Sequence, residues 1–101
     1  MKIEDAQDMM RKVYLERDRA RGVDGTLRRT FEELEELQEA IENKGSSQAL
    51  ADEFADVFAW LCSLANLLEI DVSKAFYEKY TDSCSKCKKS PCVCPEPLDL
   101  K

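Results

Sequence analysis

The sequence contains little glycine and proline, with only three residues of each among 101. It also lacks an uninterrupted apolar run long enough to span a membrane, and residues 1–8 do not resemble a secretion signal. The composition is 44% hydrophobic and 36% charged, which excludes a disordered chain. We therefore expect a soluble, helix-rich protein with a cytoplasmic location.

Basic residues are nearly absent from one stretch of the chain. Residues 31–56 carry nine acidic side chains and one basic side chain, whereas residues 1–30 carry eight basic and six acidic ones. The acidity is therefore local, and this stretch would repel nucleic acid. A nucleotide together with Mg²⁺ is more compatible with such a surface than a polymer is.

The spacing of apolar residues predicts four helices, over residues 3–19, 26–43, 48–68 and 72–81. A break is expected at residues 21–25, which contain two glycines. Gly45 is expected at C′, the position after the C-cap of the second helix that often has a left-handed conformation. Ser46 or Ser47 is expected as the N-cap of the third helix, and Asp71 as the N-cap of the fourth. The sequence contains no internal repeat that would indicate another architecture.

The third predicted helix is apolar on nearly all sides between residues 54 and 68. A chain of this length has few other helices to cover it, so a partner subunit is expected to complete the bundle. The predicted fold class is thus all-α: a four-helix bundle formed by residues 1–82 and completed in a homodimer or homotetramer. Residues 83–101 form a short cysteine-rich C-terminal tail.

Four carboxylates occur in two helical pairs. Glu33 and Glu36 are three residues apart, as are Glu53 and Asp56, so each pair lies on one helix face. If the two helices are antiparallel, the pairs converge, and four such groups would repel one another without a cation between them. Oxygen ligands of this kind suit Mg²⁺, or Mn²⁺ in its place. The alternative is a solvated acidic face on one helix and dipole-stabilising acids at the start of the next.

At these residues the chain resembles the MazG-like, all-α nucleoside triphosphate pyrophosphohydrolases. The family signature, Glu-Glu-x-x-Glu followed by Glu-x-x-Asp on the next helix, is matched by residues 32–36 and 53–56. Similarity extends over roughly residues 9–82, including the segments 17–22 and 78–80. The resemblance implies hydrolysis between the α and β phosphates of a nucleoside triphosphate, giving pyrophosphate and the nucleoside monophosphate.

The resemblance also implies roles for individual residues. The Mg²⁺ ligands would be Glu33, Glu36, Glu53 and Asp56. Glu32 or Glu36 would orient the attacking water or take its proton. The residues expected to bind the substrate are Lys79 at the phosphates, Trp60 at the base and Arg17 among the arginines that steer phosphate. For Trp60 a place in the core, and for each arginine a place on the solvated surface, are the alternatives.

The tail carries a run of cysteines with the spacing Cys-x₂-Cys-x₄-Cys-x-Cys, formed by Cys84, Cys87, Cys92 and Cys94. Four thiolates within eleven residues of a cytoplasmic chain indicate a tetrahedral structural Zn²⁺ site. A disulfide pair, an iron–sulfur cluster and free thiols are the alternatives. Cys62, in the third predicted helix, is expected to be a small core residue.

Two other classes of function remain open at the level of the sequence. The first is a non-catalytic helical adaptor whose zinc-knuckle tail, with Lys86, Lys88 and Lys89, binds nucleic acid or a protein. The second keeps the fold without catalysis and acts as a nucleotide-sensing protein. Pyrophosphate release from triphosphates in the presence of Mg²⁺ distinguishes the enzyme from both.

Overall fold

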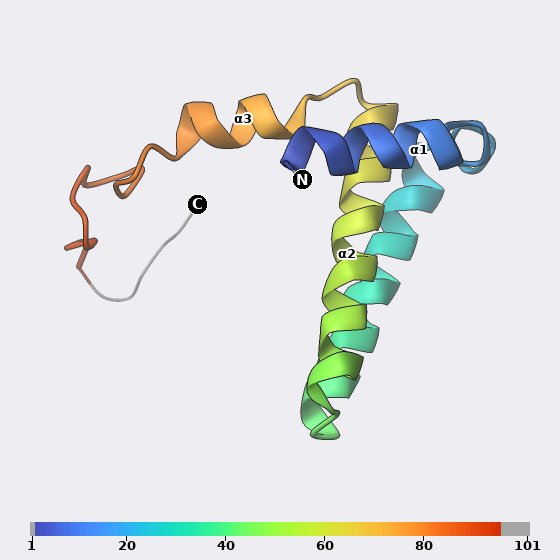
Figure 1. Ribbon diagram of the computed structural model, residues 1–101, viewed down its shortest axis with the longest axis horizontal. Coiled ribbons are helices and arrows are strands. Elements are labelled where there is room, and N and C mark those ends of the chain that lie inside the picture. The colour runs from blue at the N-terminus through green and yellow to red at the C-terminus, as the bar shows by residue number, and fades with distance from the viewer. Residues whose placement is uncertain (1, 96–101) are drawn as a thin grey trace.

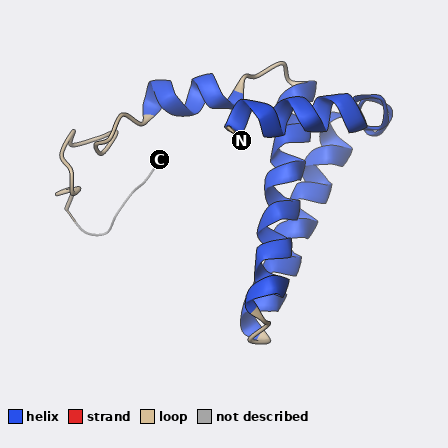
Figure 2. Cartoon of the chain, in the orientation of Figure 1, coloured by secondary structure: helices blue, strands red, loops and turns tan. Residues whose placement is uncertain are grey.

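The computed structural model describes residues 2–95 of the chain, so the last six residues of the predicted tail lie outside the description. In this part the chain forms three helices and no strand: α1 (Ile3–Glu42), α2 (Ser47–Leu67) and α3 (Val72–Lys79). Figure 1 shows that the second half of α1 runs beside α2 as a hairpin, while the first half crosses one end of it. Figure 2 shows that helices account for most of the described chain. The all-α prediction is confirmed.

The described residues form three helices, and α1 combines the first two of the four that we expected, because the predicted break at residues 21–25 is a kink inside it. Gly22 alone has non-helical dihedral angles, φ 83° and ψ 170°. This region of backbone space is open essentially only to glycine. Gly25 is needed for another reason, since a Cβ atom there would lie 2.8 Å from Cγ of Arg21. The two glycines thus turn the chain and leave room for the Arg21 side chain.

The helix ends follow the local chemistry of the sequence. Ser46 caps α2 by accepting a hydrogen bond from the Ala49 N–H at 3.1 Å, and Asp71 caps α3 by accepting one from the Lys74 N–H at 3.0 Å. Both predicted caps are confirmed. The expectation for Gly45 is wrong, because Lys44 occupies the left-handed position after α1, with φ 53°. The Gly45 N–H instead donates to the Ala40 carbonyl at 2.9 Å.

A polar network fixes the corner where the start of α1 meets the end of α2. The buried Gln7 amide donates to Asn66 Oδ1 at 2.9 Å and to the Ile70 carbonyl at 2.7 Å. Its oxygen accepts the backbone N–H of Val72 at 2.9 Å, and Asn66 donates back to the Gln7 carbonyl at 3.2 Å. A buried network whose members are satisfied specifies one arrangement of its elements. It therefore sets the direction in which α3 leaves the hairpin.

The interior of a single chain is unusually poor in apolar side chains. Among the described residues, Cys62 is the one apolar side chain that is fully buried, at 1% exposure, which confirms its predicted place in the interior. Large apolar side chains on α1 and α2 remain exposed, including Phe31 and Phe54 at 60% each. The radius of gyration is 15.9 Å, whereas a compact chain of about 100 residues has about 13 Å. No described helix has the length and apolar character that crossing a membrane requires.

Candidate metal and nucleotide site

Three carboxylates from the two arms of the hairpin come together, and we name Glu33, Glu53 and Asp56 the carboxylate cluster. One oxygen from each lies within 4.8 Å of the others. Glu33 belongs to α1 and is 6% exposed, while Glu53 and Asp56 lie one helical turn apart on α2. Three of the four acids that we expected to converge therefore do so in the described structure.

Two oxygen atoms of the carboxylate cluster are buried without a hydrogen-bond partner among the described residues. They are Glu33 Oε2 and Glu53 Oε2. A buried carboxylate oxygen with no donor carries an unfavourable desolvation energy, so such atoms are rare unless they serve a function. Both atoms are available as ligands for a cation held by the carboxylate cluster.

The local electrostatics disfavour a fully ionised cluster when no cation is present. Burial raises the pKa of Glu33 above its ordinary value of 4.5, and the charges of Glu36 and Asp56 raise it further against the opposing effect of Arg29. Burial also raises the pKa of Glu53, again with Glu36 and Asp56 adding to the effect. A divalent cation would reverse both trends, because it favours the charged form of each carboxyl.

The two remaining predicted acids lie at the edge of the carboxylate cluster. Glu36 is exposed and is not one of the three convergent groups, although its charge acts on both Glu33 and Glu53. Glu32 is held by Arg29, whose Nη1 donates to Glu32 Oε1 at 2.6 Å. The same guanidinium reaches Glu33 Oε1 with Nη2 at 3.2 Å. Arg29 thereby positions acids at the rim and at the centre of the site.

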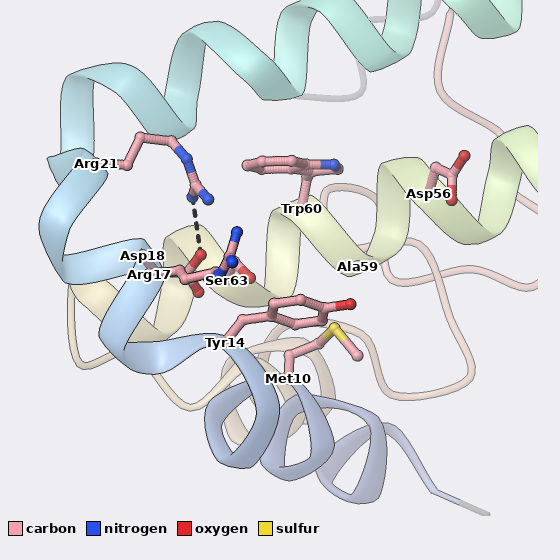
Figure 3. Close-up of a pocket in the computed structure, with 9 residues that line it drawn as sticks. All are labelled: Met10, Tyr14, Arg17, Asp18, Arg21, Asp56, Ala59, Trp60 and Ser63. Atoms are coloured by element: carbon pink, nitrogen blue, oxygen red, sulfur yellow. Dashed lines mark hydrogen bonds and ion pairs between the residues drawn. The ribbon is translucent and has the colours of Figure 1, made fainter.

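A cleft of about 320 Å³ lies beside the carboxylate cluster and shares Asp56 with it. Figure 3 shows this pocket, in which the rings of Trp60 and Tyr14 lie on opposite sides in the view drawn. Its size falls within the range of small-molecule sites in proteins. The lining residues are Met10, Tyr14, Arg17, Asp18, Arg21, Asp56, Ala59, Trp60 and Ser63. Two of the three predicted substrate-binding residues, Arg17 and Trp60, are among them.

Two arginines contact the indole of Trp60. The guanidinium carbon of Arg21 lies 4.6 Å from the ring centroid, and that of Arg29 lies 5.0 Å from it. Both distances allow cation–π attraction. Of the two, Arg21 lines the pocket and Arg29 belongs to the acidic site. Trp60 is half-buried. It lines the pocket, and its contact with Arg29 links it to the carboxylate cluster, because Arg29 also donates to Glu33.

The kink of α1 supplies the inner wall of the pocket. Arg21 Nη1 donates to Asp18 Oδ1 at 2.8 Å and to the hydroxyl of Thr26 at 3.2 Å, thus bridging the bend at Gly22. Asp18 and Thr26 are almost completely buried, with exposures of 2% and 0%. This bridge fixes the side chains that face Trp60 across the cleft.

Lys79 lies near the end of α3 and is not among the residues that line the pocket of its own chain. Its ammonium lies 5.7 Å from the ring centroid of Tyr80. Figure 1 shows α3 leading away from the α1–α2 hairpin. The described chain therefore does not bring Lys79 to Trp60 or Arg17, and its predicted role stays a prediction.

The four tail cysteines form a second group, well separated along the chain from the carboxylates. Their sulfur atoms all lie within 4.8 Å of one another. Hydrogen bonds from the backbone of Cys87 and Lys86 lower the pKa of the Cys84 thiol to about 6. Hydrogen bonding with Cys92 and with other thiols of the group raises the pKa of Cys94 to about 12. We name Cys84, Cys87, Cys92 and Cys94 the cysteine cluster.

The sequence contained a signal for ion pairs at the site that we did not predict. Asp18 and Arg21 are three residues apart, and Arg29 precedes Glu32 and Glu33 by three and four, which is the spacing of helical ion pairs. Tyr14 and Met10 gave no such signal. They reach the pocket only because the kink folds the first half of α1 across α2.

One comparison with known proteins identifies relatives of the chain. The family model described as MazG nucleotide pyrophosphohydrolase domain matches residues 21–89, which is more than half of the chain. The matched segment contains the carboxylate cluster, Trp60 and both arginines that contact it. Neither the curated proteins nor the solved structures include a match to the chain.

Proposed function

The chain belongs to the MazG nucleotide pyrophosphohydrolase domain family, and from that premise we propose that it hydrolyses a nucleoside triphosphate between its α and β phosphates. The products are pyrophosphate and a nucleoside monophosphate. The observation that carries the proposal is the carboxylate cluster beside a pocket of about 320 Å³, with Asp56 belonging to both.

The carboxylate cluster fits a divalent cation. Glu33 and Glu53 each contribute a buried oxygen that has no hydrogen-bond partner among the described residues, and Asp56 supplies a third ligand within 4.8 Å. Glu36, at the edge, completes the predicted set of ligands. When bound there, Mg²⁺, or Mn²⁺ in its place, neutralises phosphate oxygens and makes a water molecule more acidic.

The surrounding residues divide the remaining tasks. A water oxygen forms a bond to phosphorus, the bridging bond between the α and β phosphates breaks, and pyrophosphate leaves with that bond's electron pair. We assign the proton of the water to Glu36 rather than Glu32, because Oε1 of Glu32 already accepts a hydrogen bond from Arg29 at 2.6 Å. Trp60 stacks on the base and Arg17 attracts the phosphates. Lys79 retains its predicted phosphate contact on the strength of the family resemblance alone.

A second copy of the chain is the partner that we propose for the exposed apolar surface. The described chain leaves large apolar side chains uncovered on both arms of the hairpin: Leu27, Phe31, Leu34, Ile41, Phe54, Phe58 and Leu61. Isolated proteins rarely expose so many neighbouring apolar groups. Because the same two helices hold the carboxylate cluster, assembly into a homodimer or homotetramer would also fix the geometry of the site.

The decisive experiment measures pyrophosphate and monophosphate formation from a panel of ribonucleoside and deoxyribonucleoside triphosphates with Mg²⁺. Asp56→Asn and Glu36→Gln are expected to reduce turnover at least 100-fold while retaining the helical circular dichroism signal. Glu35→Gln is the matched control, since Glu35 is an exposed neighbour outside the carboxylate cluster. Triphosphate binding without turnover would indicate the sensing protein, and the absence of both would indicate the adaptor. Wild-type turnover in Asp56→Asn would remove the assignment.

A further inference from the structure

The arrangement of sulfur atoms in the cysteine cluster matches the dimensions of a single tetrahedral metal site. Cys84 Sγ lies 3.7 Å from Cys94 Sγ, and Cys87 Sγ lies 3.9 Å from Cys92 Sγ. A regular tetrahedron with Zn–S bonds of about 2.3 Å has S–S edges of about 3.8 Å. The two opposite edges of the cluster therefore have the length that one Zn²⁺ ion requires.

The backbone of the tail is folded around the sulfur atoms. The N–H groups of Lys86 and Val93 donate to Cys84 Sγ and Cys87 Sγ, each at 3.4 Å, and the N–H of Cys94 donates to Cys92 Sγ at 3.3 Å. Such donors stabilise negative charge on sulfur, and the thiolate is the form that binds metal.

Two further backbone hydrogen bonds close the loop that carries the first two cysteines. The Cys84 N–H donates to the Lys89 carbonyl and the Lys88 N–H donates to the Cys84 carbonyl, both at 2.9 Å. The cysteines are thus held as a group by their own local backbone. None of these hydrogen bonds involves a residue of α1 or α2.

The chemistry of the donors selects the ion. All four sulfurs belong to free cysteines, and separations of 3.7 and 3.9 Å are far from the disulfide bond length of about 2.05 Å. Thiolate sulfur favours Zn²⁺ over Mg²⁺, and four sulfurs leave no open position for water or substrate. A cluster of several irons needs more space than sulfurs lying within 4.8 Å of one another leave between them.

We propose that the cysteine cluster binds one Zn²⁺ ion in a closed structural site that is independent of the carboxylate cluster. The ion provides the stability that apolar packing does not supply, because residues 80–95 contain neither helix nor strand and Val93 is 66% exposed. Three lysines in the same loop, Lys86, Lys88 and Lys89, offset the charge of four thiolates around one Zn²⁺. This zinc site is an addition to the proposed hydrolytic function, and its presence does not require that the chain hydrolyses triphosphates.

The test is the metal content of the purified full chain after loading with Zn²⁺ and removal of excess ion. We expect one zinc per chain in the wild type and less than a tenth of that in Cys87→Ser. Cys62→Ala is the matched control, because Cys62 is a buried thiol on α2, and it should retain one zinc per chain. Replacement with Co²⁺ should give the charge-transfer absorption of a tetrahedral thiolate site. A wild type without zinc, equal zinc in Cys87→Ser, or iron at this site would overturn the proposal.

Hydrogen exchange provides a second measurement that is independent of catalysis. Chelation of zinc should remove protection from the amides of Lys86, Val93 and Cys94, and leave the amides of α1 and α2 protected. Unchanged protection in the tail would contradict a structural role for the ion. Since triphosphate hydrolysis is measured separately, failure of either proposal leaves the other testable.

Discussion

At the scale of residues, the site depends on acids whose surroundings oppose their charge. Glu33 and Glu53 come from different helices, and each has a buried oxygen that accepts no hydrogen bond among the described residues. Arg29 offsets this only in part, through its 3.2 Å contact with the other oxygen of Glu33. The carboxylate cluster therefore reduces the stability of the metal-free protein, and a divalent cation held there would restore it.

The raised pKa values of Glu33 and Glu53 predict how stability depends on pH. In the unfolded chain these groups lose their protons near 4.5, whereas the folded chain keeps them to higher pH. The folded state then binds more protons in that window, so the free energy of unfolding falls as pH rises through it. With a chelator present, we expect the melting temperature to fall less steeply above pH 4.5 in Glu53→Gln than in the wild type.

The control for this measurement is Glu35→Gln, which should follow the wild-type profile because Glu35 is exposed and outside the carboxylate cluster. Added Mg²⁺ should flatten the wild-type profile at neutral pH. Identical profiles for the wild type and Glu53→Gln would contradict a raised pKa for Glu53 in the folded chain.

Trp60 carries a prediction about substrate binding. Stacking of a base on an aromatic side chain contributes about 1–3 kcal/mol. Trp60→Ala is accordingly expected to raise KM for the triphosphate roughly 5- to 100-fold. Tyr77→Ala removes an exposed aromatic side chain from α3, outside the pocket, and should leave KM unchanged. Equal KM values for Trp60→Ala and the wild type would show that Trp60 does not stack on the base of the substrate.

At the scale of elements, local chemistry predicted most of the helices and the caps of α2 and α3. The i, i+3 spacing also placed Glu33, Glu53 and Asp56 on faces that converge. From the sequence we expected the break to occupy residues 21–25, whereas Gly22 alone makes the bend. Val23, Asp24 and Gly25 are already helical, and no local pattern indicated this. Nor did the sequence reveal Tyr14 and Met10 in the pocket, since their position follows from the direction of that bend. A long-range arrangement of this kind leaves no periodic pattern in the local sequence.

Two positions with positive φ, one at the kink and one in the turn after α1, give opposite predictions. Gly22→Ala places a Cβ atom in a conformation that costs about 1–3 kcal/mol, so it should lower the free energy of unfolding by that amount. Lys44→Gly relieves a left-handed conformation and should stabilise the chain by about 1 kcal/mol. Urea denaturation measures both. If Gly22→Ala leaves the free energy of unfolding unchanged, the bend does not require glycine.

At the scale of the whole molecule, the described chain leaves a large apolar surface uncovered, which is the reason that we propose a second copy as its partner. The buried side chains of the hairpin are mainly polar, and the large apolar ones lie outside. The apolar character of residues 54–68 led us to expect a partner subunit, and that expectation stays a prediction. The predicted boundary between residues 82 and 83 stays a prediction.

Assembly is tested by light scattering coupled to size-exclusion chromatography. We expect a mass two or four times the 11.6 kDa of one chain. Phe31→Lys should shift the mass toward that of one chain, because it places a charge on the exposed apolar face. Tyr77→Lys is the control, with the same 60% exposure but a place on α3. A monomeric wild type would contradict the proposed assembly.

The most direct test of the central claim is the binding of Mn²⁺ by the purified protein, followed by electron paramagnetic resonance in the presence of a non-hydrolysable triphosphate. We expect bound Mn²⁺ in the wild type and in Glu35→Gln. We expect at least tenfold weaker binding in Glu53→Gln, where a proposed ligand of the carboxylate cluster is lost. Equal affinity in Glu53→Gln and the wild type, or no bound Mn²⁺ in either, would contradict it.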